Sequence, residues 1–174
     1  MNPADLLRLI QDNKGILYKI SSSYCRNAGD REDLMQEMIY QLWRSAPRYD
    51  KNQKFSTWMY RIALNVAISF YRKTSRSGVT VELDAEAQFS DESGDEVLTE
   101  RIEVLQRFIR NLNELDKALM ILYLEERPYR EMAEILGVSE TNVATKLSRI
   151  KGRLKQEFGL GRTAPGPDNL NLMV

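Results

Sequence analysis

The sequence predicts an all-α protein of two small helical domains joined by a flexible acidic linker. Apolar residues recur at helical spacing between residues 3 and 76 and again between residues 95 and 158. Between these stretches the periodicity fails, and serine, glycine and acidic residues dominate, as is typical of a linker. The predicted organisation is a first domain over 1–76, a linker over 77–94, a second domain over 95–160 and a tail over 161–174 of unassigned role.

Two helices are predicted at the start of the first domain. The first covers residues 3–26, with proline in its first turn, and is bent or interrupted around residues 13–15. Asp30 is expected to cap the second helix, which covers residues 31–45 and ends before Pro47. The apolar stripe of the second helix consists of Leu34, Met38 and Leu42.

The third helix of this domain is expected to begin with Ser56 or Thr57 as its cap and to continue to about residue 76. In the second domain, helicity resumes near residue 95, and Asn113 is expected to cap a further helix. Pro128 marks the next break, and two more helices are predicted, over residues 129–136 and from residue 140 to about 158.

The composition excludes several classes of function. The chain has no histidine and one cysteine, Cys25, so a structural zinc site lacks ligands, and no metal or cofactor is expected. The commonest general base is absent and no carboxylate pair stands out, so the chain is not expected to be an enzyme. No apolar run is long enough to span a bilayer, and the first residues do not resemble a secretory signal, which predicts a cytoplasmic protein without membrane insertion.

Charge is balanced in total but unevenly distributed. The chain has 25 Lys plus Arg and 25 Asp plus Glu. Acidic residues collect between residues 82 and 96, whereas basic residues collect at 72–76 and at 146–155. Two basic regions separated by an acidic one indicate two separate anion-binding surfaces.

Residues 129–143, with the sequence YREMAEILGVSETNV, have the features of a helix-turn-helix. Ala133 supplies the small residue that two steeply crossing helices need, and Val143 lies where the second helix must contact it. Gly137 tolerates the positive φ of a tight turn, and Ser139 can cap the second helix. The alternative, a plain helical hairpin with a solvated basic face, stays open at this point.

The second helix of this motif divides into a buried and an exposed face. Val143, Leu147 and Ile150 form the buried stripe, so the opposite side is free to enter a major groove. The candidate DNA-contacting residues on it are Asn142, Thr145, Lys146, Arg149 and Arg153. Arg149 and Asn142 suit base edges, whereas Lys146 and Arg153 suit phosphates.

The third helix of the first domain mixes aromatic with basic residues. Aromatic rings can stack on unpaired bases while basic side chains hold the backbone, but Trp58 and Phe70 lie near the apolar stripe, which favours core packing. The candidate nucleic-acid contacts on this helix are Arg61, Asn65, Arg72 and Lys73.

Three segments resemble, in the same order, functional segments of sigma-70-type factors. Residues 30–37, DREDLMQE, resemble the segment that grips the coiled coil of the RNA polymerase β′ subunit. Residues 55–65, FSTWMYRIALN, resemble the helix that melts and reads the −10 promoter element, and the helix-turn-helix resembles the −35 reader. The resemblance covers about residues 6–158. Because no further domain fits between residues 76 and 95, the chain resembles most the two-domain extracytoplasmic-function (ECF) subfamily.

The resemblance implies a transcription initiation factor that binds core RNA polymerase, through its β and β′ subunits, and directs it to specific promoters. The implied polymerase contacts are Asp33, Gln36 and Glu37. The loop over residues 48–54 corresponds to the pocket for a flipped −10 base. Many relatives carry Arg where this chain has Leu64 and Asp where it has Ser69, so weak DNA melting and dependence on a well-matched promoter are expected.

Two other functions compete with this interpretation. A helix-turn-helix regulator acting without polymerase-bound promoter melting explains the second domain but leaves residues 30–65 unexplained. An enzyme would need a catalytic constellation that the composition does not offer. The resemblance also implies an anti-sigma partner that covers the DNA- and polymerase-binding faces.

Overall fold

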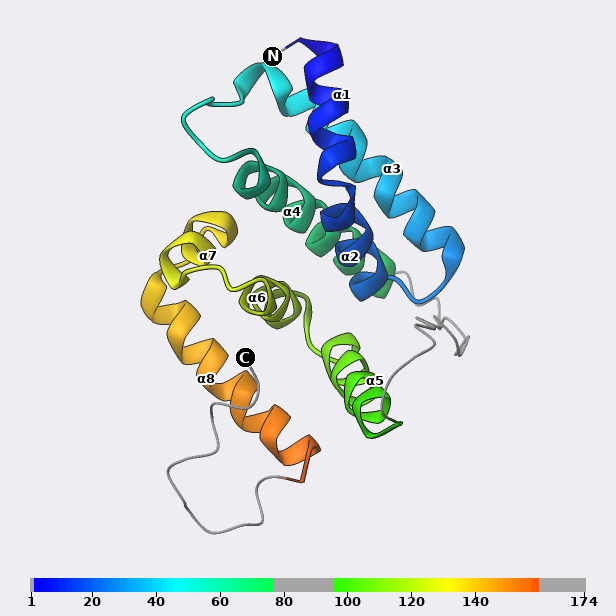
Figure 1. The fold of residues 1–174 in the computed structure, drawn as a ribbon, viewed down its shortest axis with the longest axis vertical. Helices are drawn as coiled ribbons and strands as arrows, with labels where there is room; N and C mark the ends of the chain where they lie inside the picture. The colour runs from blue at the N-terminus through cyan, green and yellow to red at the C-terminus, as the bar shows by residue number, and fades with distance from the viewer. Residues whose placement is uncertain (1, 77–95, 160–174) are drawn as a thin grey trace.

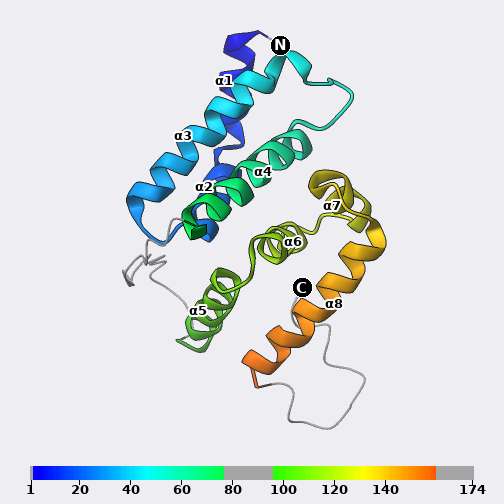
Figure 2. The ribbon, with the colours of Figure 1, turned by 180° about the vertical axis from the view of Figure 1, so that it is seen from behind.

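The computed structural model describes residues 2–76 and 96–159, which form eight α-helices and one short 3-10 helix and contain no strand (Figures 1 and 2). The elements are α1 (Pro3–Asp12), α2 (Lys14–Tyr24), α3 (Ala28–Ser45), η1 (Ala46–Arg48), α4 (Phe55–Arg76), α5 (Glu96–Arg110), α6 (Glu114–Leu124), α7 (Tyr129–Leu136) and α8 (Glu140–Glu157). The predicted all-α class is confirmed. None of the helices in these ranges is both long and apolar enough to cross a membrane. The predicted linker, residues 77–94, and the predicted tail, residues 161–174, lie outside the described residues.

The interruption expected near residues 13–15 is confirmed at Asn13, which separates α1 from α2. Asn13 has φ −113° and ψ 14°, and its side-chain amide donates to the Leu9 carbonyl at 2.9 Å. That side chain therefore satisfies one of the carbonyls left free where α1 ends.

The predicted start of α3 is wrong by three residues. The helix begins at Ala28 with Asn27, not Asp30, as its N-cap, because the Asn27 side-chain oxygen accepts from the Asp30 backbone N–H at 2.7 Å. Asp30 instead lies in the first turn, where a carboxylate faces the positive end of the helix dipole. The end of α3 before Pro47 is confirmed.

The predicted caps of α4 are also wrong. The helix begins at Phe55, so Ser56 and Thr57 lie inside its first turn, and the Trp58 N–H already bonds to the Lys54 carbonyl at 3.2 Å. The Thr57 hydroxyl donates elsewhere, to the Glu131 carboxylate of α7 at 2.5 Å. A contact with the other half of the chain thus replaces the local cap.

The core of the first half forms where α3 packs on α4 and α2. The predicted stripe of Leu34, Met38 and Leu42 is fully buried. Trp58 is only 7% exposed, which confirms its core role, and its ring packs with those of Tyr49 and Phe55 at centroid distances of 5.0 and 5.3 Å. This aromatic cluster fixes the loop that precedes α4.

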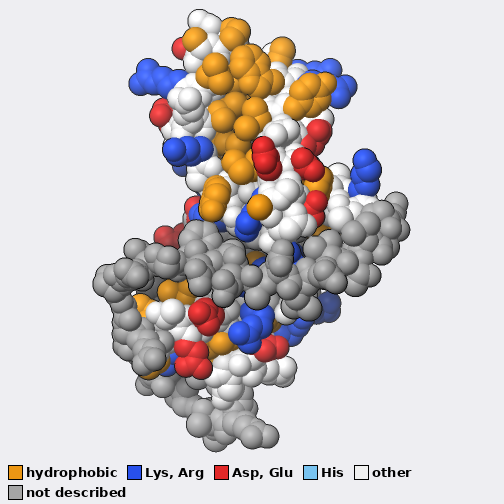
Figure 3. All heavy atoms as spheres, turned by 90° about the vertical axis from the view of Figure 1, so that its right-hand side faces the viewer, with side chains coloured by type: hydrophobic (Ala, Val, Ile, Leu, Met, Phe, Trp, Pro, Cys, Tyr) orange, Lys and Arg blue, Asp and Glu red, His pale blue; other side chains and the backbone are white. Residues whose placement is uncertain are grey.

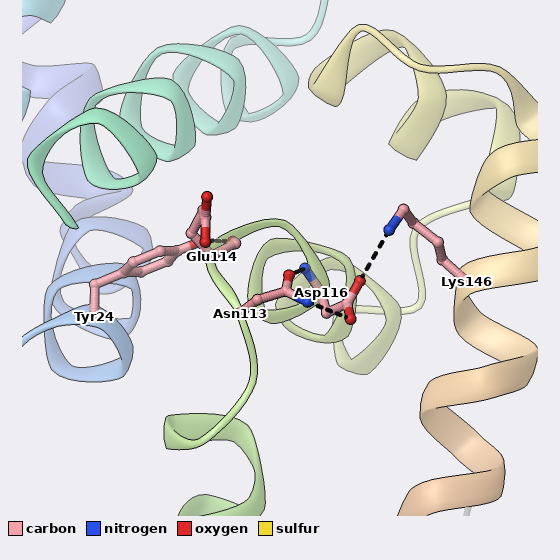
Figure 4. A network of polar contacts seen from close by, with 5 residues as sticks. All are labelled: Tyr24, Asn113, Glu114, Asp116 and Lys146. Atoms are coloured by element: carbon pink, nitrogen blue, oxygen red, sulfur yellow. Dashed lines mark hydrogen bonds and ion pairs between the residues drawn. The ribbon is translucent and has the colours of Figure 1, made fainter. Parts of the chain in front are cut away.

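In the second half, α8 packs against α7, α6 and α5. The Asn113 cap is confirmed, since its side-chain oxygen accepts from the Asp116 N–H at 2.9 Å (Figure 4). Along α6, residues 117–122 are all buried, including the charged side chain of Lys117. A helix buried on nearly all sides is expected where it packs between other elements.

The two halves pack against each other rather than standing apart. Figures 1 and 2 show α6 lying beside α4 and α2, and α7 lying at the start of α4. The buried apolar residues of both halves form one continuous cluster. We call this the closed arrangement; it determines which candidate site residues are accessible.

Candidate nucleic-acid interface

The helix-turn-helix of α7 and α8 has the geometry that the sequence predicted. Ala133 and Val143 are buried where the two helices meet. Gly137 ends α7 with φ 67° and ψ 35°, in the left-handed region, and Ser139 caps α8 by accepting from the Asn142 N–H at 3.1 Å. The turn therefore holds α8 at a fixed angle to α7.

We expect Gly137→Ala to lower the free energy of unfolding by about 1–2 kcal/mol, because a side chain at that φ is strained although space around it is open. Gly152→Ala is the matched comparison. Gly152 lies within α8, also with open space around it, so alanine there should raise stability by about 0.5–1 kcal/mol. Urea unfolding of the two variants measures both changes, and effects of the same sign would contradict this account of the turn.

The exposed face of α8 brings the predicted −35 residues together. Asn142, Thr145, Lys146 and Arg149 line one shallow hollow on this helix. Asn142, Thr145 and Arg149 are exposed and accessible to a major groove. Lys146 is half-buried, and its ammonium lies 3.4 Å from the Asp116 carboxylate of α6 (Figure 4). A phosphate contact by Lys146 would therefore require the release of Asp116.

Further along α8, two basic residues pack on rings of their own half. The exposed Arg153 guanidinium lies 5.8 Å from the Phe108 ring centroid, and the Lys151 ammonium lies 5.1 Å from that of Tyr123. Such contacts hold long side chains in place without removing their charge. Arg153 thus stays available to a phosphate.

The predicted −10 residues on α4 are exposed but partly engaged by the second half. Spacing of 3.6 residues per turn places Arg61, Asn65 and Arg72 on one side of α4, with Lys73 beside them. The Arg61 guanidinium donates to the Glu134 carbonyl at 2.9 Å, and the Arg72 guanidinium lies 2.8 Å from a Glu114 carboxylate oxygen.

The Arg72 bond is the main reason that the pKa of Glu114 is lowered. The closed arrangement therefore covers part of the −10 face.

Further contacts join the halves around this face. Glu131 of α7 accepts from Thr57 of α4 at 2.5 Å and from Arg127 at 2.8 Å, and the Arg127 guanidinium lies 5.2 Å from the Tyr60 ring centroid. Tyr60 is fully buried, so its ring cannot stack on an unpaired base in the closed arrangement.

Two more contacts link α2 to α6. Lys19 of α2 forms an ion pair with Glu125, and the Tyr24 hydroxyl donates to the Glu114 carbonyl at 2.5 Å (Figure 4). Burial is the main cause of the raised pKa of Tyr24, which keeps its hydroxyl protonated and able to donate.

The third candidate surface runs along α3. Asp33, Gln36 and Glu37 are all exposed, on the side opposite the buried stripe. Two aromatic residues continue this face: Tyr40 is 58% exposed and Trp43 is 37% exposed. Figure 3 shows hydrophobic side chains gathered over the end of the molecule formed by α1 and α3, with acidic side chains beside them.

Sequence reasoning missed Tyr40 and Trp43 as members of this surface. The same helical spacing that relates Asp33 to Glu37 also relates Gln36 to Tyr40 and Trp43, so continuing the period two turns would have found them. Exposed aromatic residues beside acidic ones are typical of protein-binding surfaces rather than of solvated ones.

Comparisons with known proteins identify a family region in each half of the chain. Residues 9–77 match the model of Sigma-70 region 2, and residues 102–154 match that of Sigma-70 region 4. The chain is 28% identical over 170 residues to the ECF RNA polymerase sigma factor SigW of Bacillus subtilis, covering 89% of this chain and 88% of that protein. It is 26% identical to the ECF sigma factor SigM of the same organism, covering 83% of this chain and 90% of SigM.

Solved structures show the same fold. The sigma factor RpoE in complex with the anti-sigma factor NepR from Bartonella quintana superposes with a TM-score of 0.69 at 20% identity, covering 91% of this chain and 97% of RpoE. CnrH, in complex with the cytosolic domain of CnrY, superposes with a TM-score of 0.65 at 16% identity, covering 92% and 91%. With both regions matched in order and ECF relatives aligned over most of the chain, this protein belongs to the sigma-70 family, in its ECF subfamily.

Proposed function

We propose that the chain binds core RNA polymerase and directs it to promoters by recognising a −10 and a −35 element. One observation carries the proposal: a single chain presents a helix-turn-helix face, a basic helix face and an acidic and aromatic face. The first suits duplex DNA, the second suits a separated strand, and the third suits a protein partner. The chain acts by binding rather than by catalysis, in the cytoplasm where polymerase and DNA meet.

Each surface has its own role in this proposal. Arg149 and Asn142 read base edges in the −35 major groove, while Arg153 contacts phosphates. Arg61, Asn65 and Arg72, with Lys73, hold the −10 strand. The loop before α4, fixed by the Tyr49, Phe55 and Trp58 rings, lies where a flipped base is to be received.

Run-off transcription tests the proposed function. Purified core polymerase and fragmented genomic DNA from the host are incubated with and without the chain. Discrete new transcripts that depend on the chain are expected, and their start sites reveal the promoter sequence. No transcripts and no binding to core polymerase, together with tight specific duplex binding by the chain alone, would favour the regulator instead.

Polymerase binding is expected to depend on the exposed face of α3. We expect Asp33→Ala and Gln36→Ala each to lower the affinity for core polymerase about 5- to 30-fold, as loss of one well-placed interface side chain does. Tyr40→Ala should act in the same direction because its ring is exposed beside them.

Binding to core polymerase, measured by fluorescence anisotropy, checks these effects. Glu103→Ala, an exposed acidic residue on α5, is the matched control and should change nothing. Binding of a −35 duplex should also stay unchanged in every variant. Equal loss of polymerase and duplex binding would show that the α3 variants damage the fold rather than one surface.

An anti-sigma partner is part of the proposal because one of the similar solved structures, RpoE with NepR, is a complex with an anti-sigma factor. The exposed face of α3 and the α4 face give such a partner surfaces to cover. Affinity purification of the tagged chain from its native host should recover it. Recovery of the chain only free or with polymerase would argue against a dedicated partner.

A further inference from the structure

A cavity of about 210 Å³ lies where the two halves of the chain meet. Its wall includes Arg26 after α2, Arg110 at the end of α5 and Lys117 of α6, so its charged residues come from both halves. The volume is below the usual range for sites that hold drug-sized molecules, which suits a small ion.

Lys117 is the unusual residue in this wall. It is only 2% exposed, and its ammonium lies 5.1 and 5.2 Å from the ring centroids of Tyr24 and Tyr71. Within the described parts of the chain, no hydrogen bond or ion pair joins this ammonium to an acceptor. The two rings offset part of the cost of burying the charge, but among the described residues no oxygen forms a hydrogen bond with its N–H donors.

The surroundings of Lys117 are positively charged. The pKa of Lys117 is lowered to about 8, mainly by burial, with smaller contributions from the charges of Arg26 and Arg110. Asp30 supplies the one carboxylate of the wall, and its oxygen accepts from the Asn27 side chain at 2.7 Å. Glu114 also lies close enough to raise the pKa of Lys117, but it is not part of the wall and is paired with Arg72 at 2.8 Å. The wall itself therefore has three cations against one engaged carboxylate.

We propose that this cavity binds a small tetrahedral oxyanion of the phosphate class, held by Lys117 together with Arg26 and Arg110. The anion supplies acceptor oxygens that the described residues do not provide to the buried ammonium, and it separates three like charges. Because Arg26 belongs to the first half and the other two belong to the second, the bound anion also favours the closed arrangement. Binding of the anion does not depend on the proposed promoter function.

The chain carries its own reporter of this cavity. Cys25 is the one cysteine in the sequence, lines the same wall and is 5% exposed. Burial, with a smaller contribution from Asp30, raises the pKa of its thiol to about 12, so little reactive thiolate forms at neutral pH. A thiol reagent is therefore expected to modify Cys25 mainly when the halves separate.

The test measures how fast 5,5′-dithiobis(2-nitrobenzoate) modifies Cys25 in the full chain at pH 7. Inorganic phosphate is compared with sodium chloride at equal ionic strength. Phosphate at ten times its dissociation constant should slow the reaction about tenfold, by mass action on the closed arrangement. Sulfate, another tetrahedral dianion, should also protect. Equal rates in phosphate and chloride would overturn the proposal.

Two variants separate a specific site from general screening. Lys117→Met keeps the aliphatic stem, removes the charge and should abolish protection by phosphate while the far-ultraviolet circular dichroism stays unchanged. Lys151→Met is the matched control, since Lys151 also lies over a tyrosine ring but outside the cavity. If Lys117→Met proves unstable, Arg110→Gln serves as the test in its place and should weaken the protection of Cys25 by phosphate. Protection that survives both Lys117→Met and Arg110→Gln would mean that phosphate acts elsewhere.

Discussion

A chain whose two halves are cross-linked in the closed arrangement is expected to lose at least nine tenths of its promoter-dependent transcription. The cross-link joins cysteines introduced by Lys19→Cys and Glu125→Cys in a Cys25→Ala background. These two side chains form an ion pair between α2 and α6 and lie outside the candidate DNA and polymerase surfaces. A short, reducible bifunctional thiol reagent therefore spans them without displacing a proposed contact.

The physical reason is the distance between the two promoter elements. Their positions, −10 and −35, differ by about 25 base pairs, on the order of 85 Å along B-form DNA. In the closed arrangement the Arg61 guanidinium of the −10 face lies 2.9 Å from the carbonyl of Glu134, in the first helix of the helix-turn-helix. Bending so short a duplex far enough to bring the elements together costs several kcal/mol, so the halves must separate instead.

Run-off transcription before and after reduction of the cross-link measures this effect. Reduction should restore activity, and each single-cysteine variant treated with the same reagent should remain active. A cross-linked chain that transcribes as well as the reduced one would show that the closed arrangement already fits a promoter, and the assignment of the two DNA faces would then be wrong.

Arg149→Ala is expected to weaken binding of the holoenzyme to a promoter with a matched −35 element about 5- to 150-fold. Arg149 is exposed at the centre of the α8 face, and a bidentate arginine on a base contributes about 1–3 kcal/mol of discrimination. The variant should therefore hardly distinguish the matched promoter from one with a scrambled −35 element.

Lys155→Ala is the comparison for this substitution. Lys155 is exposed near the end of α8, and we expect it to contact a phosphate rather than a base edge. Loss of this side chain should weaken binding to both promoters equally. It should also reduce the number of counterions released on binding, measured from the salt dependence, by about one. Filter binding at several salt concentrations measures both variants. If Arg149→Ala behaves like Lys155→Ala, Arg149 contacts phosphate and another residue reads the bases.

Local features of the fold followed from the sequence because short-range chemistry determines them. Gly137 adopts the positive φ expected of a residue without a Cβ, and Ser139 and Asn113 cap the helices that follow them. The wrong cap of α3 has a local cause too. Asn27 and Asp30 can both cap a helix, and only the three-dimensional structure shows that Asn27 does so.

Long-range contacts were beyond the sequence. Nothing in the pattern of α4 indicates that Thr57 bonds to Glu131 or that Arg61 bonds to Glu134, each more than 70 residues away. Lys117, beside the apolar run of α6, likewise gives no sign in the sequence that it lies between two tyrosine rings. Periodicity places a residue on a face, but it does not show what packs against that face.

The ion pairs that join the halves have a consequence for ionic strength. Arg72–Glu114 and Lys19–Glu125 are partly exposed, so added salt screens them and favours separation of the halves. The same salt weakens the contacts that basic residues of α8 make with phosphates. Salt thus acts in opposite directions on two successive steps, and promoter occupancy by the chain should pass through a maximum as salt rises instead of falling steadily.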